Sequence, residues 1–270
     1  MNITEQEFLK FSSYIRTNFG ISLSHKKISF LTSRLGRLLE KSNFKNFSEY
    51  YSFVTEDASG EAIIEMINKI TTNYTYFYRE EKHFDFLKRE VLPYIKEKEK
   101  DLRDLRIWSA ACSSGEEPYA LQMIIRDFFG DQNRQWDTSL LATDISTKSL
   151  IKAKNAVYPK ESIEKIPDLW KKKYFKKYDE DHVAVTEDIK RDVLLKRFNL
   201  MNEFPFKRKF HVIFCRNVMI YFDNQTKNEL VNKFYKFTEP GGYLFIGHSE
   251  SIDRNSSQYK YLQPAIYRKE

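Results

Sequence analysis

The sequence predicts a small all-α segment followed by a larger α/β domain with a doubly wound, mainly parallel sheet. Three observations support this fold class. Apolar residues recur at helical spacing through the first seventy positions, and after them short apolar runs alternate with amphipathic stretches. Residues 106–125, "RIWSAACSSGEEPYALQMII", read as strand, tight turn and helix, an arrangement that usually positions a cofactor in α/β proteins.

The N-terminal segment, residues 1–70, contains four helix-like stretches. "TEQEFLKFSSYIRTNFG" has an N-cap residue at Thr4 and a stop at Gly20, and "SHKKISFLTSRLGRLLEKSN" carries one apolar stripe with its basic residues largely off it. "FSEYYSFVTED" and "EAIIEMINKI" complete the unit. Because about 70 residues is near the lower limit for a self-sufficient core, we expect this unit to pack against the rest of the chain.

Residues 71–270 start with a helix, "EKHFDFLKREVLPYIKEKEK", and then alternate strands with helices, which implies a sheet covered on both faces. The predicted strands are Leu105–Ala110, Ser139–Thr143, His211–Cys215 and Tyr243–Ile246. The predicted helices are Glu116–Phe129, Thr147–Ala156 and Gln225–Phe237. The alternation of strands and helices is interrupted from Tyr174 onward. Short extended pieces and a polar turn there predict a β-subdomain inserted at about residues 174–198.

Composition favours a soluble protein with a packed core. Hydrophobic residues make up 41% and charged residues 31% of the chain, and the mean hydropathy is −0.61. No apolar run approaches the roughly 20 residues of a membrane span, and the N-terminus does not resemble a signal peptide. The two cysteines, Cys112 and Cys215, lie far apart and form no CxxC pair. We therefore expect a cytoplasmic protein without a disulfide framework, a metal site or direct membrane insertion.

The net charge of +7 is typical of proteins that bind an acidic protein, a nucleic acid or a membrane surface. Between Ile21 and Lys45 six cations stand against one acid, Glu40. These cations are Lys26, Lys27, Arg34, Arg37, Lys41 and Lys45. A second cluster, formed by Lys171, Lys172, Lys173, Lys176 and Lys177, is more simply read as a solvated face.

The turn after the first predicted strand places Glu116 and Glu117 at its mouth, whereas a phosphate-binding turn offers glycines and bare N–H groups. The next strand, "LLATDIS", ends at Asp144, where a carboxylate can accept hydrogen bonds from both hydroxyls of a ribose. Together they favour a cationic nucleoside, S-adenosylmethionine (SAM). Two simpler explanations stay open: a capping box Ser114-x-x-Glu117, and Asp144 as the cap of the helix near Thr147.

Five stretches of the chain resemble the CheR family of chemotaxis receptor methyltransferases. They are "TTNYTYFYREEKHF", "RIWSAACSSGEEPYALQM", "ATDIS", "FHVIFCRNVMIYFD" and "PGGYLFIGHSES". The resemblance covers nearly the whole chain. It implies a class I SAM-dependent methyltransferase fold with an N-terminal helical docking domain, and an O-methyltransferase that esterifies glutamate side chains of chemoreceptors and releases S-adenosylhomocysteine. The implied partner is the cytoplasmic helical region of these membrane receptors, and we expect a monomer.

The resemblance also implies residues that bind the cofactor. They are Asn73, Thr75, Arg79, Glu117, Asp144, Asn199, Leu200, Arg216 and Asn217. The departures from the family pattern are Tyr74, where members often have Glu, and Ala111, where many have Gly. A glutamate acceptor is already ionised at neutral pH, so the reaction needs alignment rather than a general base. Arg79 could hold the acceptor's carboxylate or the cofactor's own.

Tyr221 follows the fourth strand, where it could orient the acceptor or simply pack as an aromatic residue. His248 is interpreted as a structural polar residue and the two cysteines as small packing residues. Two other functions fit parts of the sequence. A nucleic-acid methyltransferase would suit the charge, but "CRNVMIY" replaces the [DN]PP[YF] loop that amino-directed enzymes use to hold a flipped base, so we expect no nucleic-acid substrate. A binding protein that keeps the SAM pocket without turnover stays open.

Overall fold

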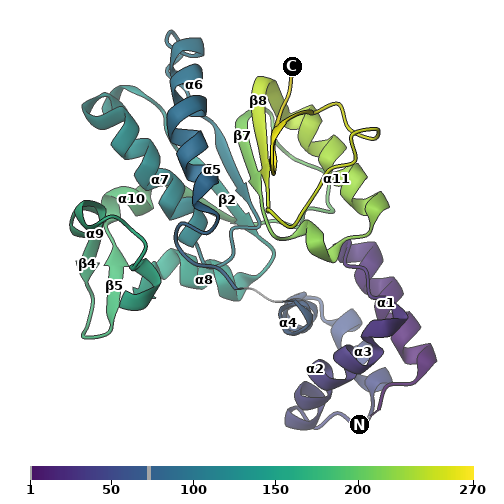
Figure 1. Ribbon diagram of the computed structural model, residues 1–270. Coiled ribbons are helices and arrows are strands. Elements are labelled where there is room, and N and C mark those ends of the chain that lie inside the picture. Colours follow the sequence, from purple (N-terminus) through teal and green to yellow (C-terminus); the bar gives the residue numbers. More distant parts are fainter. Residues whose placement is uncertain (1, 72–73) are drawn as a thin grey trace.

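The computed structural model describes residues 2–71 and 74–270. Its N-terminal helices lie together as one group beside the sheet, with α1 next to α11 (Figure 1). The helices are α1 (Glu5–Phe19), α2 (Ile28–Lys41), α3 (Phe47–Glu56) and α4 (Glu61–Ile70). Both predicted ends of α1 are confirmed: Thr4 and Glu7 form a capping box, and Gly20 closes the helix with a left-handed φ of 70°.

The described part of residues 74–270 contains a seven-stranded sheet in the order β6-β2-β1-β7-β8-β10-β9. Its strands are β1 (Ile107–Ala110), β2 (Leu140–Asp144), β6 (Val193–Arg197), β7 (Phe210–Cys215), β8 (Thr238–Ile246), β9 (Lys260–Gln263) and β10 (Ile266–Arg268). The first five in that order run parallel, while β10 and β9 are antiparallel to their neighbours. The predicted fold class, a mainly parallel sheet after an all-α segment, is confirmed.

Helices cover both faces of this sheet, with α6 and α7 on one side and α11 on the other (Figure 1). The helices are α5 (Glu81–Phe86), α6 (Leu92–Lys98), α7 (Glu116–Phe129), α8 (Thr147–Asn155) and α11 (Asn224–Phe237). A π-helical turn, Leu87–Val91, joins α5 to α6. Alternate strand residues enter two separate cores: Val212 and Phe214 pack on the side of α7, and Trp108 and Ile213 on the side of α11.

The inserted subdomain is a three-stranded antiparallel sheet in the order β3-β5-β4. It contains β3 (Val157–Pro159), α9 (Asp168–Tyr174), β4 (Phe175–Lys177) and β5 (His182–Val185), and α10 (Glu187–Arg191) leads back to the main sheet. The predicted bounds of 174–198 are therefore wrong at both ends. The sheet starts with β3, and residues 193–197 form β6, which pairs with β2 in the main sheet. β6 is an edge strand and exposes Leu194, Lys196 and Arg197. It therefore lacks the continuous apolar run of a central strand, and the sequence pattern did not indicate that it belongs to the main sheet.

The N-terminal helices share one hydrophobic core with α11 and the α11-side face of the sheet. Ile21 forms a β-bridge with Phe222, and the Ser22 N–H donates to the Tyr221 carbonyl over 2.8 Å. Two ion pairs add to the contact, Arg16 with Asp223 at 2.8 Å and Arg197 with Glu61 at 3.0 Å. The expectation that the helical unit packs against the rest of the chain is confirmed.

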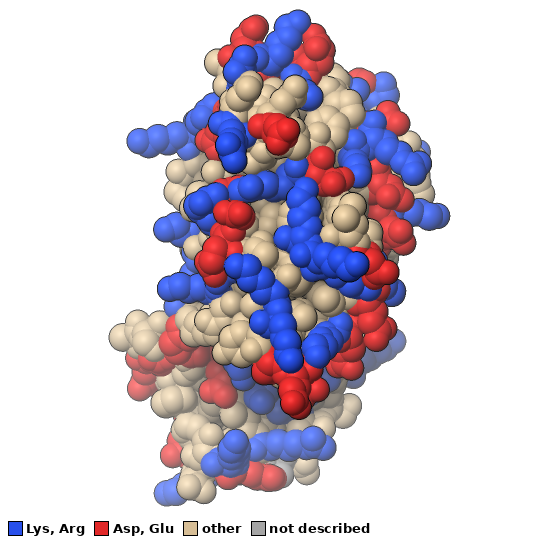
Figure 2. Space-filling model, turned by 90° about the vertical axis from the view of Figure 1, so that its left-hand side faces the viewer, with Lys and Arg blue, Asp and Glu red and all other residues tan. Residues whose placement is uncertain are grey.

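The face that carries the inserted subdomain mixes Lys and Arg with Asp and Glu rather than presenting one sign of charge (Figure 2). On this subdomain, four of the five clustered lysines are exposed, and Lys171 pairs with Asp168 at 3.0 Å. An exposed acidic turn at Asp179–Asp181 lies between β4 and β5. Among the described residues, no helix combines the length and the apolar character that crossing a bilayer requires.

Candidate active site

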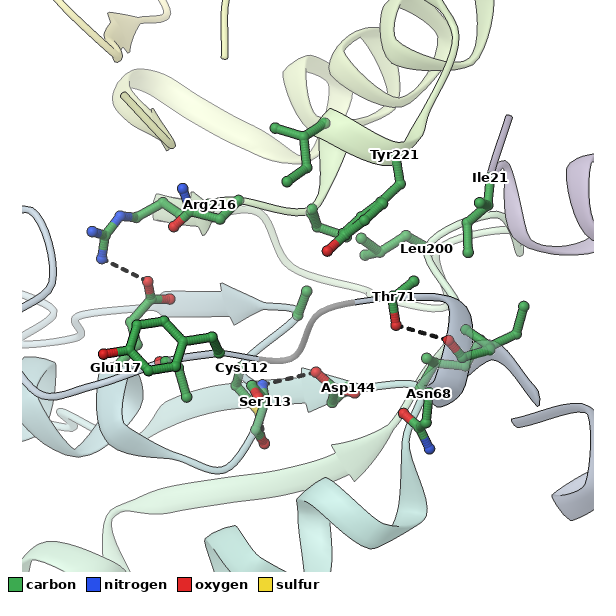
Figure 3. Close-up of a pocket in the computed structure, with 18 of the residues that line it drawn as sticks. Ile21, Asn68, Thr71, Cys112, Ser113, Glu117, Asp144, Leu200, Arg216 and Tyr221 are labelled. Carbon is green, nitrogen blue, oxygen red and sulfur yellow. Dashed lines mark hydrogen bonds and ion pairs between the residues drawn. The ribbon is translucent and has the colours of Figure 1, made fainter. Parts of the chain in front are cut away.

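A cavity of about 530 Å³ opens at the carboxyl ends of the parallel strands (Figure 3). It lies where the strand order reverses between β1 and β7, the position at which doubly wound sheets bind their ligands. Cys112 and Ser113 follow β1, Asp144 ends β2, and Arg216 follows β7. The turns after these strands therefore form one wall.

Asp144 is held by the turns on either side of it. Its Oδ2 accepts the Ser113 N–H at 2.8 Å, and its Oδ1 accepts the Ser146 N–H at 2.8 Å. Burial raises the pKa of Asp144, and hydrogen bonds from Ser146 and Ser113 act in the opposite direction. Ser146, not Asp144, caps α8 by accepting from Ser149 N–H. The interpretation of Asp144 as a helix cap is wrong, and its carboxylate faces the cavity (Figure 3).

Glu117 also points into the cavity rather than back onto its own helix (Figure 3). One oxygen accepts from the Ser109 hydroxyl at 2.7 Å and the other from Arg216 Nη1 at 2.8 Å. The alternative explanation, a capping box Ser114-x-x-Glu117, is wrong, because the N-cap of α7 is Gly115 and the Ser114 hydroxyl donates to Glu116 at 2.8 Å. Gly115 is required here: its φ is 98°, and a Cβ would lie 2.9 Å from both Ala153 Cβ and the Tyr158 hydroxyl.

Arg216 is the central cation of the wall, and its side chain is only 2% exposed. Beyond Glu117, its Nη2 lies 3.0 Å from Glu80 Oε2 and also donates to the Arg79 carbonyl. The next residue, Asn217, donates its side-chain amide to Glu80 at 3.2 Å and its backbone N–H to Glu250 at 3.0 Å. This wall is therefore built around a buried ion-pair network.

The other predicted site residues lie around the same cavity, except Asn73, which is outside the described residues. Those lining it are Thr75, Arg79, Asn199, Leu200, Asn217 and Tyr221. Arg79 Nη1 donates to the Tyr74 carbonyl at 2.7 Å, and the Asn199 amide donates to the Asn18 carbonyl at 2.8 Å. The Tyr221 ring projects into the cavity (Figure 3). Their contacts with a cofactor stay predictions.

Sequence reasoning missed a second wall, which comes from the N-terminal helices. Phe19 at the end of α1, Ile21 just after it, and Ile67 and Asn68 in α4 line the cavity. Ile21 and Asn68 lie across it from Arg216 (Figure 3). Apolar residues of an amphipathic helix carry no signal that distinguishes a cavity wall from ordinary core. Glu80 and Glu250 were also missed, although both lie inside the family-like strings "YREEKHF" and "GHSES".

Two family models together match nearly the whole chain. Residues 73–267 match the model described as "CheR methyltransferase, SAM binding domain", and residues 6–71 match "CheR methyltransferase, all-alpha domain". The chain belongs to the CheR methyltransferase family. It is a SAM-binding chemotaxis methyltransferase.

Relatives of this CheR-family chain align with nearly its whole length. A chemotaxis protein methyltransferase of Borreliella burgdorferi is 44% identical and covers 100% of this chain and 96% of its own. A probable chemotaxis protein methyltransferase of Rhizobium etli is 34% identical, with coverage of 94% and 99%. Chemotaxis protein methyltransferase 2 of Vibrio cholerae is 35% identical, with coverage of 94% and 88%.

The cavity of this CheR-family chain fits SAM by its chemistry. Two carboxylates, Glu117 and Asp144, suit the cofactor's positive groups and ribose hydroxyls, and apolar residues such as Phe198 and Leu200 offer a surface for a nucleobase. Cys112 and Cys215 are buried, and burial raises the pKa of both thiols, in agreement with a packing role. The structure thus holds no conflict with a SAM-binding assignment.

Glu80, His83 and His248 place their ligand atoms within 4.8 Å of one another, a spacing that could also suit a metal ion. However, both oxygens of Glu80 already accept hydrogen bonds, from Arg216, from Asn217 and from the His248 N–H at 3.1 Å. Burial and the nearby Arg216 charge lower the pKa of His83 to about 3, so this ring is neutral. The Glu80 carboxylate of this cluster is engaged in the ion pair with Arg216.

Proposed function

We propose that the protein transfers the methyl group of SAM to glutamate side-chain carboxylates of chemoreceptors and forms glutamyl methyl esters. One observation carries this choice of acceptor: among the described residues, the cavity is lined by no histidine or lysine that could act as a general base. The carboxylates that line it, Glu117 and Asp144, are engaged by Arg216 and by backbone N–H groups. A glutamate acceptor needs no base, because it is ionised at neutral pH.

When bound, SAM supplies an electrophilic methyl group. The chain's own residues then have to orient the cofactor and the acceptor and to exclude water. Asp144 would hold the ribose, and Glu117 with Arg216 would hold the amino-acid end; Asn73, Thr75, Asn199, Leu200 and Asn217 complete the proposed cofactor contacts. Arg79 and Tyr221 are the proposed catalytic residues: the guanidinium would hold a carboxylate at the reacting centre, and the phenol would orient the acceptor.

The proposed partner is the cytoplasmic, glutamate-rich helical region of a membrane chemoreceptor, met by a monomer of this protein in the cytoplasm. Residues 1–70 would be the docking domain and residues 71–270 the catalytic one. Support comes from α2 and the 3₁₀ turn before it (His25–Lys27). Leu31, Leu35 and Leu39 are buried, whereas Lys26, Arg34 and Arg37 are exposed. A basic helix face matches an acidic partner and chiefly affects encounter rate and orientation.

Transfer of labelled methyl groups from SAM to receptor-containing membranes tests this function. The expected product is a base-labile ester on the receptor that releases labelled methanol, and a receptor whose acceptor glutamates are changed to alanine should take up no label. Label that resists base, or that enters nucleic acid, would contradict the proposal. SAM binding without any transfer would leave a binding protein as the function.

A further inference from the structure

Glu80 lies directly behind the cavity wall and does not itself line the cavity. We propose that Glu80 is a specificity-determining residue: its buried negative charge biases the pocket toward positively charged SAM and against the neutral product, S-adenosylhomocysteine. The inference rests on the SAM chemistry of the proposed function but not on the identity of the acceptor.

The contacts of Glu80 join three parts of the site. Its carboxylate accepts from Arg216 Nε at 3.2 Å and Nη2 at 3.0 Å, from the Asn217 amide at 3.2 Å, and from the His248 N–H at 3.1 Å. Arg216 and Asn217 follow β7, and His248 follows β8. Glu80 therefore fastens the ends of two strands to the segment that precedes α5.

The backbone at Glu80 is held in a conformation that a glutamate rarely adopts. Its φ of 61° and ψ of 57° are left-handed. A non-glycine residue is strained in this region, so such a conformation persists where other interactions over-determine it. Here the carboxylate contacts supply those interactions, which shows that the position of this charge is fixed by the fold.

The charges around Arg216 do not balance. Arg216 contributes +1, and its two ion-pair partners, Glu80 and Glu117, contribute −1 each, which leaves a net −1. Burial raises the pKa of Glu80, but the Arg216 charge and the hydrogen bonds from Asn217, His248 and Arg216 outweigh it, so its pKa lies below the usual range. The side chains of Glu80 and Glu117 are only 13% and 14% exposed, so water screens this excess charge weakly.

The two forms of the cofactor differ in charge at one atom. During transfer, the carboxylate oxygen forms a bond to the methyl carbon, the sulfur–carbon bond breaks, and its electron pair stays on sulfur. The positive sulfonium thereby becomes a neutral thioether. The net negative cluster of Arg216, Glu80 and Glu117 attracts the first form and has no such attraction for the second. This difference favours exchange of product for fresh cofactor.

Calorimetric titration of the full chain with three ligands tests this proposal: SAM, S-adenosylhomocysteine and sinefungin, whose amine keeps a positive charge in place of the sulfonium. In Glu80→Gln the preference for SAM over S-adenosylhomocysteine, taken as the ratio of their Kd values, should shift toward the product by on the order of tenfold. Sinefungin should follow SAM. Glu81→Gln, which removes an exposed acid one residue away, should keep the wild-type ratio.

Glu80→Asp separates charge from shape, because it keeps the charge while shortening the side chain. All three ligands should weaken together in this variant, with the ratio preserved. Equal weakening of all three in Glu80→Gln would mean that Glu80 only positions Arg216, and an unchanged ratio would overturn the proposal. Where Glu80→Gln does not fold, as judged by thermal unfolding, a shifted ratio in Glu80→Asp would overturn it as well.

Discussion

The two walls of the cavity are built in different ways. The strand-end wall is polar, and its side chains are fixed by short contacts such as Arg216 to Glu117 at 2.8 Å and Ser113 to Asp144 at 2.8 Å. The helical wall, with Phe19, Ile21 and Ile67, is largely apolar and is positioned by packing of one segment against another.

This difference separates two kinds of requirement. A polar wall tolerates almost no change of residue type, since each charge is buried with its partner and loss of one leaves the other uncompensated. An apolar wall tolerates many residues of similar volume, but it depends on correct docking of the helices. Substitutions in the strand-end wall should therefore act on charge balance and cofactor affinity, and those in the helical wall on docking.

The largest effect is expected for Arg216→Met. It leaves Glu80 and Glu117 buried without their shared cation, so the free energy of unfolding should fall by about 3–5 kcal/mol. Chemical denaturation of the ligand-free protein measures this. A loss below ~1 kcal/mol would mean that water reaches the network and that the wall is not organised by charge.

Asp144→Ala should weaken SAM binding by about 1.5–3 kcal/mol, because a charged acceptor for the ribose is removed. Asp144→Asn keeps one acceptor oxygen and should lose less. Isothermal calorimetry gives both values. Unchanged SAM affinity in the alanine variant would mean that Asp144 does not bind the ribose.

Gly20→Ala tests the docking of the helical wall. The new Cβ would lie 2.6 Å from Met201 Sδ and 2.9 Å from Thr226 Cγ2, at a φ of 70°. We expect a loss of about 1–2 kcal/mol in unfolding free energy, with a smaller change in SAM affinity. Gly36→Ala is the matched control: nothing lies within 4 Å of its Cβ, so thermal unfolding should show an unchanged or raised stability.

Arg79→Lys tests the proposed catalytic role of Arg79, which lines the cavity. A lysine keeps the charge but not the bidentate fork, so kcat/KM for receptor methylation should fall about tenfold, which corresponds to ~1.4 kcal/mol. Steady-state kinetics at saturating SAM measure this effect. Near-normal turnover would remove Arg79 from the catalytic residues.

The smallest effect on stability is expected on the basic surface formed by α2 and the 3₁₀ turn before it, neither of which lines the cavity. Lys27→Glu with Arg34→Glu should change unfolding free energy and SAM affinity by less than ~0.5 kcal/mol, but it should slow receptor methylation. The wild-type rate should fall as salt rises, because exposed charges are screened over about 8 Å at physiological ionic strength. Equal salt dependence in both proteins would make the helix a solvated face only.

Much of the fold was predictable because its signals are local. The cap at Thr4, the stop at Gly20 and the apolar runs of β1, β2 and β7 each depend on a few neighbouring residues. The inserted subdomain was misplaced because pairing of β6 with β2 is a tertiary contact of an edge strand. Pattern alone cannot assign such a strand.

The residues of the strand-end wall could also be predicted from the sequence, since Glu117, Asp144 and Arg216 follow predicted strands. Their exact partners could not, because a local capping box was an open alternative for Glu117, whereas its ion-pair partner lies 99 positions away in the chain. The helical wall could not be predicted at all. It arises only when α1 and α4 dock beside residues 198–222.

The β-bridge between Ile21 and Phe222, one residue from Tyr221, has a consequence for heat denaturation. Neither the helices nor the sheet domain can separate without opening the cavity, so a ligand bound there is released when either part melts. Ligand binding to the native state alone adds RT ln(1 + [L]/Kd) to stability. Saturation with cofactor should therefore make both parts unfold in a single endotherm, as one cooperative unit rather than as two.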